Sequence, residues 1–214
     1  MAQQSHAKVW IFDLDDTLHN ASAHIFPMMN QAMTQYIMES LVLDEIAAHR
    51  LRQHYWRVYG ATLKGLMRHH GADPHHFLNE THKLDDLPDM VLAVKRLRHM
   101  LNSLIGRKLV FTNAPRNYAL RVLALLGISD CFELVFSVES TKFHAKPSVR
   151  GFQLLLKTIK VKASDCIMLE DNLAALMTAK RLGMKTIWIS KKLQKPNFVD
   201  YRLTHVLALT HLQL

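Results

Sequence analysis

Three aspartates, Asp13, Asp15 and Asp16, directly follow the apolar run Trp10-Ile11-Phe12. Such a run is typical of a buried strand, and a buried strand does not end in clustered negative charge unless a cation or a reaction compensates it. Because alternate residues of an extended segment point to opposite faces, Asp13 and Asp15 can share one side of the strand end. Asp16 is then expected to point away as a solvated or capping acid. The pattern suits a bound Mg²⁺ and a phosphate ester.

Three further polar clusters follow or precede predicted elements later in the chain. Thr112-Asn113 ends a predicted strand, Glu170-Asp171 ends another, and Lys146-Pro147 opens a predicted helix. Because ligands bind at the carboxyl ends of parallel strands, all these clusters are expected to meet in one crevice. Each cluster alone also has an ordinary interpretation as a cap, a turn or a surface residue. Together with Asp13 they supply the parts for phosphoryl transfer through a covalent aspartyl phosphate.

In this hypothesis Asp13 is the nucleophile. Asp15 is the general acid that protonates the leaving alkoxide, and then the base that activates water. The metal site is expected to consist of Asp13, the main-chain carbonyl of Asp15 and the carboxylate of Asp171, with Glu170 orienting a water on the ion.

The remaining two clusters are expected to bind the phosphate. Thr112 offers a hydroxyl, and the segment Thr112-Asn113 offers amides, to the phosphate oxygens. Lys146 places a cation against the charge that develops in the transition state. Catalytic roles are therefore predicted for Thr112 and Lys146, and substrate binding for Thr112, Asn113 and Lys146.

The elements that must position these residues alternate between strand and helix. The first predicted strand is 9–12, and the alternation resumes after Pro88. It predicts an α/β fold, a Rossmann-like parallel sheet with helices on both faces. The later predicted strands are 108–112, 134–137, 166–169, 185–189 and 205–207, and the predicted helices are 90–101, 118–126, 148–158 and 173–182.

A helical segment separates the first two predicted strands. Apolar residues recur there at helical spacing, and Asp73-Pro74 is typical of a helix start. We therefore predict a core domain of residues 1–18 and 89–214 and an inserted α-helical cap domain of residues 19–88. The two apolar stripes are Ile25, Met29, Met33 and Tyr36-Ile37, and then Ile46, Leu51, Tyr55 and Val58.

Composition limits the functional classes. The chain has 214 residues, 49% of them hydrophobic, and a formal net charge of +9. This charge favours an anionic partner, but the basic residues are dispersed and no nucleic-acid-binding motif accompanies them, so a small phosphorylated metabolite is expected rather than nucleic acid. The polar N-terminus lacks a signal-peptide layout and no segment is apolar enough to span a bilayer, which predicts a cytoplasmic protein without a membrane partner. Both cysteines are expected to be free thiols.

The four clusters resemble the motifs of the haloacid dehalogenase superfamily of phosphohydrolases over nearly the whole chain. Residues 13–18 (DLDDTL) match its nucleophile motif, 111–113 (FTN) the second, 146–147 (KP) the third and 170–172 (EDN) the acidic fourth. The helical segment after the first strand is similar to the family's cap. The resemblance implies a Mg²⁺-dependent phosphatase.

Within that superfamily the chain is similar to the pyrimidine 5′-nucleotidase-type branch. The similarity rests on residues 16–19 (DTLH), the cap stretch 59–66 (YGATLKGL) and residues 111–114 (FTNA). It implies a nucleoside 5′-monophosphate substrate, which cationic or aromatic groups in the cap would bind. The candidates there are Arg57, Tyr59 and Lys64. Glu170 departs from the branch, which often has a second aspartate at this position.

Other functions remain open. The same core chemistry also serves a sugar phosphate, phosphoglycolate or another small ester, because the core motifs contact only phosphate and metal. A non-catalytic basic interaction module on the same fold is the alternative from another class. Dehalogenation is disfavoured, because a halide ion leaves without a proton and Asp15 would then have no role. The cap histidines at positions 69, 70, 75, 76 and 82 are expected to serve surface or packing roles.

Overall fold

A six-stranded, entirely parallel sheet forms the centre of the larger of two units in this computed structural model, which describes residues 8–212. The strand order is β3-β2-β1-β4-β5-β6. The chain adds β2 and β3 on one side of β1, then crosses over and adds β4, β5 and β6 on the other side. This arrangement confirms the predicted α/β, Rossmann-like class. The strands are β1 (Val9–Phe12), β2 (Arg107–Phe111), β3 (Leu134–Phe136), β4 (Cys166–Glu170), β5 (Lys185–Ile189) and β6 (Tyr201–Leu203).

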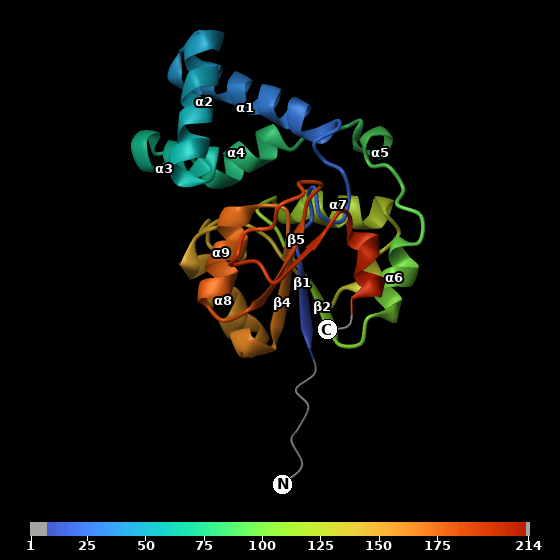
Figure 1. The fold of residues 1–214 in the computed structure, drawn as a ribbon. Helices are drawn as coiled ribbons and strands as arrows, with labels where there is room; N and C mark the ends of the chain where they lie inside the picture. Colours follow the sequence, from blue (N-terminus) through green and yellow to red (C-terminus); the bar gives the residue numbers. More distant parts are fainter. Residues whose placement is uncertain (1–7, 213–214) are drawn as a thin grey trace. The chain divides into compact units, whose positions relative to one another are not determined.

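The two central strands are buried along their whole length, as expected for a parallel sheet with helices on both faces. Figure 1 shows α8 (Val149–Ile159) and α9 (Leu173–Arg181) on one face and α6 (Leu97–Ser103) on the other. Phe152 and Leu155 of α8 and Leu176 of α9 pack with residues of the sheet in one apolar cluster. This packing holds the two helices against the sheet whose strand ends carry the predicted site residues.

The described residues divide into two compact units. We call residues 8–20 and 91–212 the core unit and Ala21–Met90 the helical insert. The remaining core helices are α7 (Arg116–Leu125) and three 3₁₀ helices, Ser129–Cys131, Ala163–Asp165 and Val206–His211. The insert consists of α1 (Ile25–Leu41), α2 (Glu45–Tyr59), α3 (Thr62–His70), α4 (Pro74–Thr81) and α5 (Leu87–Met90).

Two predicted elements of the core are wrong. The strand expected at 205–207 is a 3₁₀ helix, and Tyr201–Leu203 pairs with β5 instead. Val206 and Leu209 are buried at a spacing of three residues, which suits a 3₁₀ helix. The helix expected at 90–101 is interrupted before α6, because Arg96 adopts a left-handed conformation with φ of 67°.

In the helical insert, the first apolar stripe is confirmed by the burial of Ile25, Met29, Tyr36 and Ile37 on α1, and its remaining member, Met33, is half-buried. The second stripe is wrong at its ends, because Ile46 and Val58 are 65% and 56% exposed. Small and aromatic residues, Ala48 and Tyr55, make the buried face of α2 instead.

The start of α4 follows the predicted signal. Asp73 accepts hydrogen bonds from the main-chain N–H groups of His75 and His76, and Pro74 occupies the first helical position. Within residues 8–212, no helix has the length and apolar character to cross a membrane. The cytoplasmic location stays a prediction.

Candidate active site

The carboxyl ends of three adjacent strands carry the predicted site residues. Asp13 follows β1, Thr112 follows β2 and Glu170 ends β4, and β1 lies between β2 and β4. The main-chain N–H of Asp13 donates to the carbonyl of Leu169 at 2.9 Å, which continues the sheet to the residue that carries the carboxylate. This edge is the point where the strand order reverses, the usual ligand site of open parallel sheets.

Lys146 joins two of these carboxylates. Its Nζ lies 2.6 Å from Asp13 Oδ1 and 2.6 Å from Glu170 Oε2, and all three side chains are buried. The ammonium also lies 5.2 Å from the ring centroid of Phe111, at the end of β2. The structure therefore brings together residues that are 133 and 24 positions apart in the sequence.

Burial raises the pKa of Asp13 to about 7, and the negative charge of Glu170 adds to this rise, although Lys146 opposes it. Burial likewise raises the pKa of Glu170 to about 7, again against the effect of Lys146. For Lys146, burial lowers the pKa, but the two carboxylates outweigh it and hold the pKa above its ordinary value. The ammonium therefore keeps its charge, while the carboxylates lack a full counter-charge.

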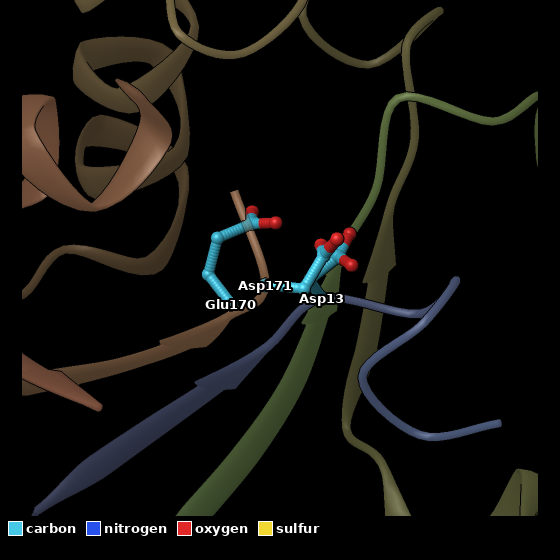
Figure 2. A group of neighbouring side chains, drawn as sticks. All are labelled: Asp13, Glu170 and Asp171. Carbon is cyan, nitrogen blue, oxygen red and sulfur yellow. The ribbon is translucent and has the colours of Figure 1, made fainter. Parts of the chain in front are cut away.

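Asp171 adds a third carboxylate. Oxygens of Asp13, Glu170 and Asp171 lie within 4.8 Å of one another, and Figure 2 shows the three side chains at the ends of β1 and β4. Trp188 Nε1 donates to the carbonyl of Asp171 at 2.8 Å and fixes this turn. Oxygen ligands of this kind suit a hard divalent cation, which would also supply the counter-charge that Lys146 alone does not. The group can hold a metal ion.

Asn113, the residue after Thr112, lies beside Lys146. The Asn113 side chain accepts from the main-chain N–H of Lys146 at 2.7 Å and donates to its carbonyl at 3.0 Å. This pair of bonds fixes the backbone that carries the lysine, a contact the sequence did not predict. Thr112 is buried, and its Oγ1 accepts from the N–H of Ala114 at 3.0 Å, which leaves its O–H as a donor.

Asp15 has different surroundings from Asp13. Its Oδ1 accepts from Tyr118 Oη at 2.7 Å and lies 2.9 Å from His19 Nε2. Burial, followed by the charge of Asp15, raises the pKa of the Tyr118 phenol above its ordinary value, so the hydroxyl remains a donor. The sequence reasoning assigned no role to Tyr118 or His19. The spacing of Asp15 and His19, four residues apart in a turn, was the available signal.

The three substrate-binding candidates of the predicted cap all lie in the helical insert. Arg57 is exposed on α2 and donates from Nε to the carbonyl of Gln53 at 3.4 Å. Tyr59 ends α2, and its hydroxyl lies 2.6 Å from His69 Nε2. Lys64 is exposed on α3. Their roles stay predictions.

A family model described as haloacid dehalogenase-like hydrolase matches residues 10–189, which include every core motif above. The chain belongs to the haloacid dehalogenase-like hydrolases. The predicted superfamily is thereby confirmed, whereas the pyrimidine 5′-nucleotidase branch stays a prediction.

Two curated relatives are similar in sequence. Phosphate metabolism protein 8 of Saccharomyces cerevisiae is 28% identical over 193 residues, which are 83% of this chain and 60% of the yeast protein. Validoxylamine A 7′-phosphate phosphatase of Streptomyces hygroscopicus subsp. limoneus is 30% identical over 103 residues, 46% of this chain and 48% of that protein. The chain thus matches about half to three fifths of the length of these relatives.

Solved structures share the fold of haloacid dehalogenase-like hydrolases. A phosphatase of this family from Thermococcus onnurineus superimposes with a TM-score of 0.66 at 19% identity, covering 95% of this chain and 96% of that one. L-2-haloacid dehalogenase from Xanthobacter autotrophicus gives 0.60 at 14% identity, covering 96% and 98%. Because a phosphatase and a dehalogenase both share it, the fold does not select the reaction.

Proposed function

We propose that this chain is a Mg²⁺-dependent phosphomonoesterase that acts through an aspartyl phosphate on Asp13. The observation that carries the proposal is the contrast between two carboxylates two residues apart. Asp13 lies against Lys146 together with the carboxylates of Glu170 and Asp171, whereas Asp15 accepts a hydrogen bond from the Tyr118 hydroxyl and lies beside His19. Pairs of carboxyl groups in different environments are typical of a nucleophile and an acid–base partner.

In the first step, an Asp13 carboxylate oxygen attacks phosphorus and forms an acyl phosphate. The bond between phosphorus and the ester oxygen breaks, and Asp15 gives its proton to that oxygen, so the product leaves as an alcohol. Lys146 stabilises the negative charge on the transferring phosphoryl group, and the Thr112 hydroxyl binds one of its oxygens.

In the second step, water attacks the phosphorus of the acyl phosphate. Asp15, now a carboxylate, takes a proton from that water, and the bond between phosphorus and the Asp13 oxygen breaks. Inorganic phosphate leaves, and both aspartates return to their starting states. A carbon–halide displacement would use Asp13 but would need no acid for the leaving halide ion, which favours phosphate esters over haloacids.

The donor set supports a metal-dependent reaction. Asp13, Asp171 and the main-chain carbonyl of Asp15 would hold Mg²⁺, with Glu170 beside them. When bound, the ion would neutralise phosphate charge and orient the ester for in-line attack.

For the substrate, we propose a nucleoside 5′-monophosphate, supported by the motif resemblance to the pyrimidine 5′-nucleotidase-type branch. The helical insert is proposed to act as the cap that selects the leaving group, with Arg57, Tyr59 and Lys64 as contacts. A second candidate is another small phosphate ester, because the Streptomyces relative is named as a phosphatase of validoxylamine A 7′-phosphate.

A panel of phosphate esters tests the proposal. The purified chain is assayed with pyrimidine and purine nucleoside monophosphates, sugar phosphates and phosphoglycolate, with Mg²⁺ or with a chelator. We expect phosphate release that requires the metal, with the highest kcat/KM for pyrimidine nucleotides. Release from haloacids alone, or salt-dependent nucleic-acid binding without any phosphate release, would contradict the proposal.

A further inference from the structure

The hydrogen bonds to Asp15 are one-sided. Both bonds that the described residues make to its carboxyl group end on Oδ1, from Tyr118 at 2.7 Å and from His19 at 2.9 Å. We infer that Tyr118 and His19 are positioning residues that fix the Asp15 carboxyl group, so that Oδ2 delivers and takes the proton. This inference rests on the proposed function, in which Asp15 is the acid and the base.

Tyr118 reaches Asp15 from a rigid element. It lies near the start of α7, 103 residues further along the chain, and its side chain is 2% exposed. A phenol has few rotatable bonds, so a packed tyrosine can fix a hydrogen bond precisely. Because α7 follows the turn after β2, the helix that holds this hydroxyl starts from the same edge of the sheet as Thr112.

His19 reaches the same oxygen from the turn after β1. Leu18 donates its N–H to the carbonyl of Leu14 at 2.9 Å, and Asp16 adopts φ of 59°, so the backbone reverses and returns beside Asp15. His19 is 5% exposed, and its Nδ1 has no hydrogen-bond partner among the described residues. The tautomer with hydrogen on Nε2 therefore gives the better pairing, since it places a donor on the carboxyl oxygen.

Two donors on one oxygen have a chemical consequence. They stabilise negative charge on Oδ1 and prevent rotation of the carboxyl group, which leaves Oδ2 to carry the transferable proton. Proton transfer in a transition state depends on such positioning, because a small misplacement of the acid lowers the rate. Loss of either donor is therefore expected to slow the departure of basic leaving groups and to leave substrate binding unchanged.

Tyr118→Phe tests the inference, because it removes one hydroxyl and keeps the ring. The substrates are phosphate monoesters with Mg²⁺, from p-nitrophenyl through phenyl to alkyl esters. We expect kcat for alkyl esters to fall roughly 10-fold to 100-fold, part of the 10²–10⁴-fold that acid–base catalysis contributes, with KM unchanged. For p-nitrophenyl phosphate, whose leaving group departs without a proton, we expect the first step, measured as the pre-steady-state burst of p-nitrophenol, to slow by less than about 3-fold, while the second step slows because Asp15 is also its base.

Tyr201→Phe is the matched control, since it removes a tyrosine hydroxyl elsewhere in the core unit, on β6, and should show no dependence on the leaving group. His19→Gln keeps an N–H donor near the position of Nε2, whereas His19→Leu does not. We expect the glutamine variant to retain most of the kcat for alkyl esters and the leucine variant to lose it. Thermal unfolding of each variant reports whether it folds.

The outcomes separate the two proposals. If wild-type protein releases phosphate but Tyr118→Phe and His19→Leu slow the release of the alcohol or phenol in the first turnover by the same factor for every ester, the positioning inference is wrong and the proposed function stands. If folded wild-type protein hydrolyses none of the esters, the proposed function itself fails.

Discussion

Buried polar side chains differ between the two units of the chain. In residues 21–90, all of which the structure describes, the buried polar side chains are three threonines. Each donates its hydroxyl to a main-chain carbonyl, at 2.8 to 3.2 Å. They are Thr34, Thr62 and Thr81. Each of these bonds gives a buried hydroxyl a hydrogen-bond partner within the insert, as packing requires.

The core unit buries charge. Asp13, Lys146 and Glu170 are each less than 10% exposed and lie in direct contact. Burying ions costs free energy that their mutual attraction repays only in part, and well-packed apolar residues are often at least as stable. The contrast supports the proposed active site in the core unit, because buried charge that does not serve packing is found there and not in the helical insert.

The largest effect on this comparison is expected from neutralising Asp13, the proposed nucleophile. Asp13→Asn is expected to lower kcat by at least roughly 10³-fold, because the amide is not a nucleophile, while thermal unfolding shows a retained fold. The control is Asp16→Asn in the same turn, since asparagine tolerates the φ of 59° found there. Comparable rates for the two variants would contradict the assignment.

Removal of the buried cation tests the electrostatics. Lys146→Met leaves Asp13 and Glu170 buried without their partner, so we expect a loss of about 3–5 kcal/mol in the free energy of unfolding, measured by urea denaturation with a chelator. Lys180→Met is the matched control, because Lys180 pairs with Asp200 at 2.6 Å but is 40% exposed. There we expect a loss of at most about 1 kcal/mol. Equal losses would show that burial does not set the cost.

The buried carboxyl group of Glu170 is expected to make the free energy of unfolding depend on pH. The folded-state pKa of Glu170, about 7, exceeds its ordinary value of 4.5, so the folded protein binds the extra proton between these values. Stability from this group is therefore present at low pH and is lost as pH rises toward 7. Relative to Glu170→Gln, wild-type protein with a chelator should lose at least about 1 kcal/mol between pH 4 and 7.

Denaturation of both proteins across that interval measures the difference, and Mg²⁺ should reduce it, because a cation favours the ionised carboxylate. A difference that stays constant with pH would show that Glu170 does not titrate in this way.

The smallest expected effects lie in the helical insert. Lys64→Ala is expected to raise KM for the preferred ester by less than about 10-fold and to leave kcat unchanged, since a surface cation contributes to binding alone. Lys83→Ala is the control, an exposed lysine that pairs with Glu80 at 2.8 Å on the same unit. A large fall in kcat for Lys64→Ala would place it among the reacting groups.

The sequence predicted the sheet and the clusters at its edge for one physical reason. Three of the four clusters follow an apolar run, and apolar runs in parallel strands are buried, as β1 and β4 are. The pattern did not reveal Tyr118 as a partner of Asp15, because a buried tyrosine near a helix start has the same periodicity as a packing residue. The contact joins residues 103 positions apart, and only the fold brings them together.

The wrong prediction for the second apolar stripe also arises because the contacts depend on the fold. Ile46 and Val58 are apolar and correctly spaced, yet they are exposed, because the small size of Ala48 and the ring of Tyr55 determine which face of α2 packs. Tyr55 in turn packs against Gly65 of α3, where an added Cβ would lie 2.2 Å from the ring. Such shape complementarity depends on the partner helix, so the sequence of α2 alone does not predict which face is buried.

Chemical trapping of the covalent intermediate tests the central claim most directly. Asp15→Asn, which lacks the base for the second step, is mixed with Mg²⁺ and p-nitrophenyl phosphate, a substrate whose leaving group needs no acid. The mixture is quenched and reduced with borohydride, which converts an acyl phosphate of aspartate into homoserine. Peptide mass spectrometry should then find homoserine at position 13 and only when substrate is present. Phosphate release without modification of Asp13, or with modification of another carboxylate, would contradict the account.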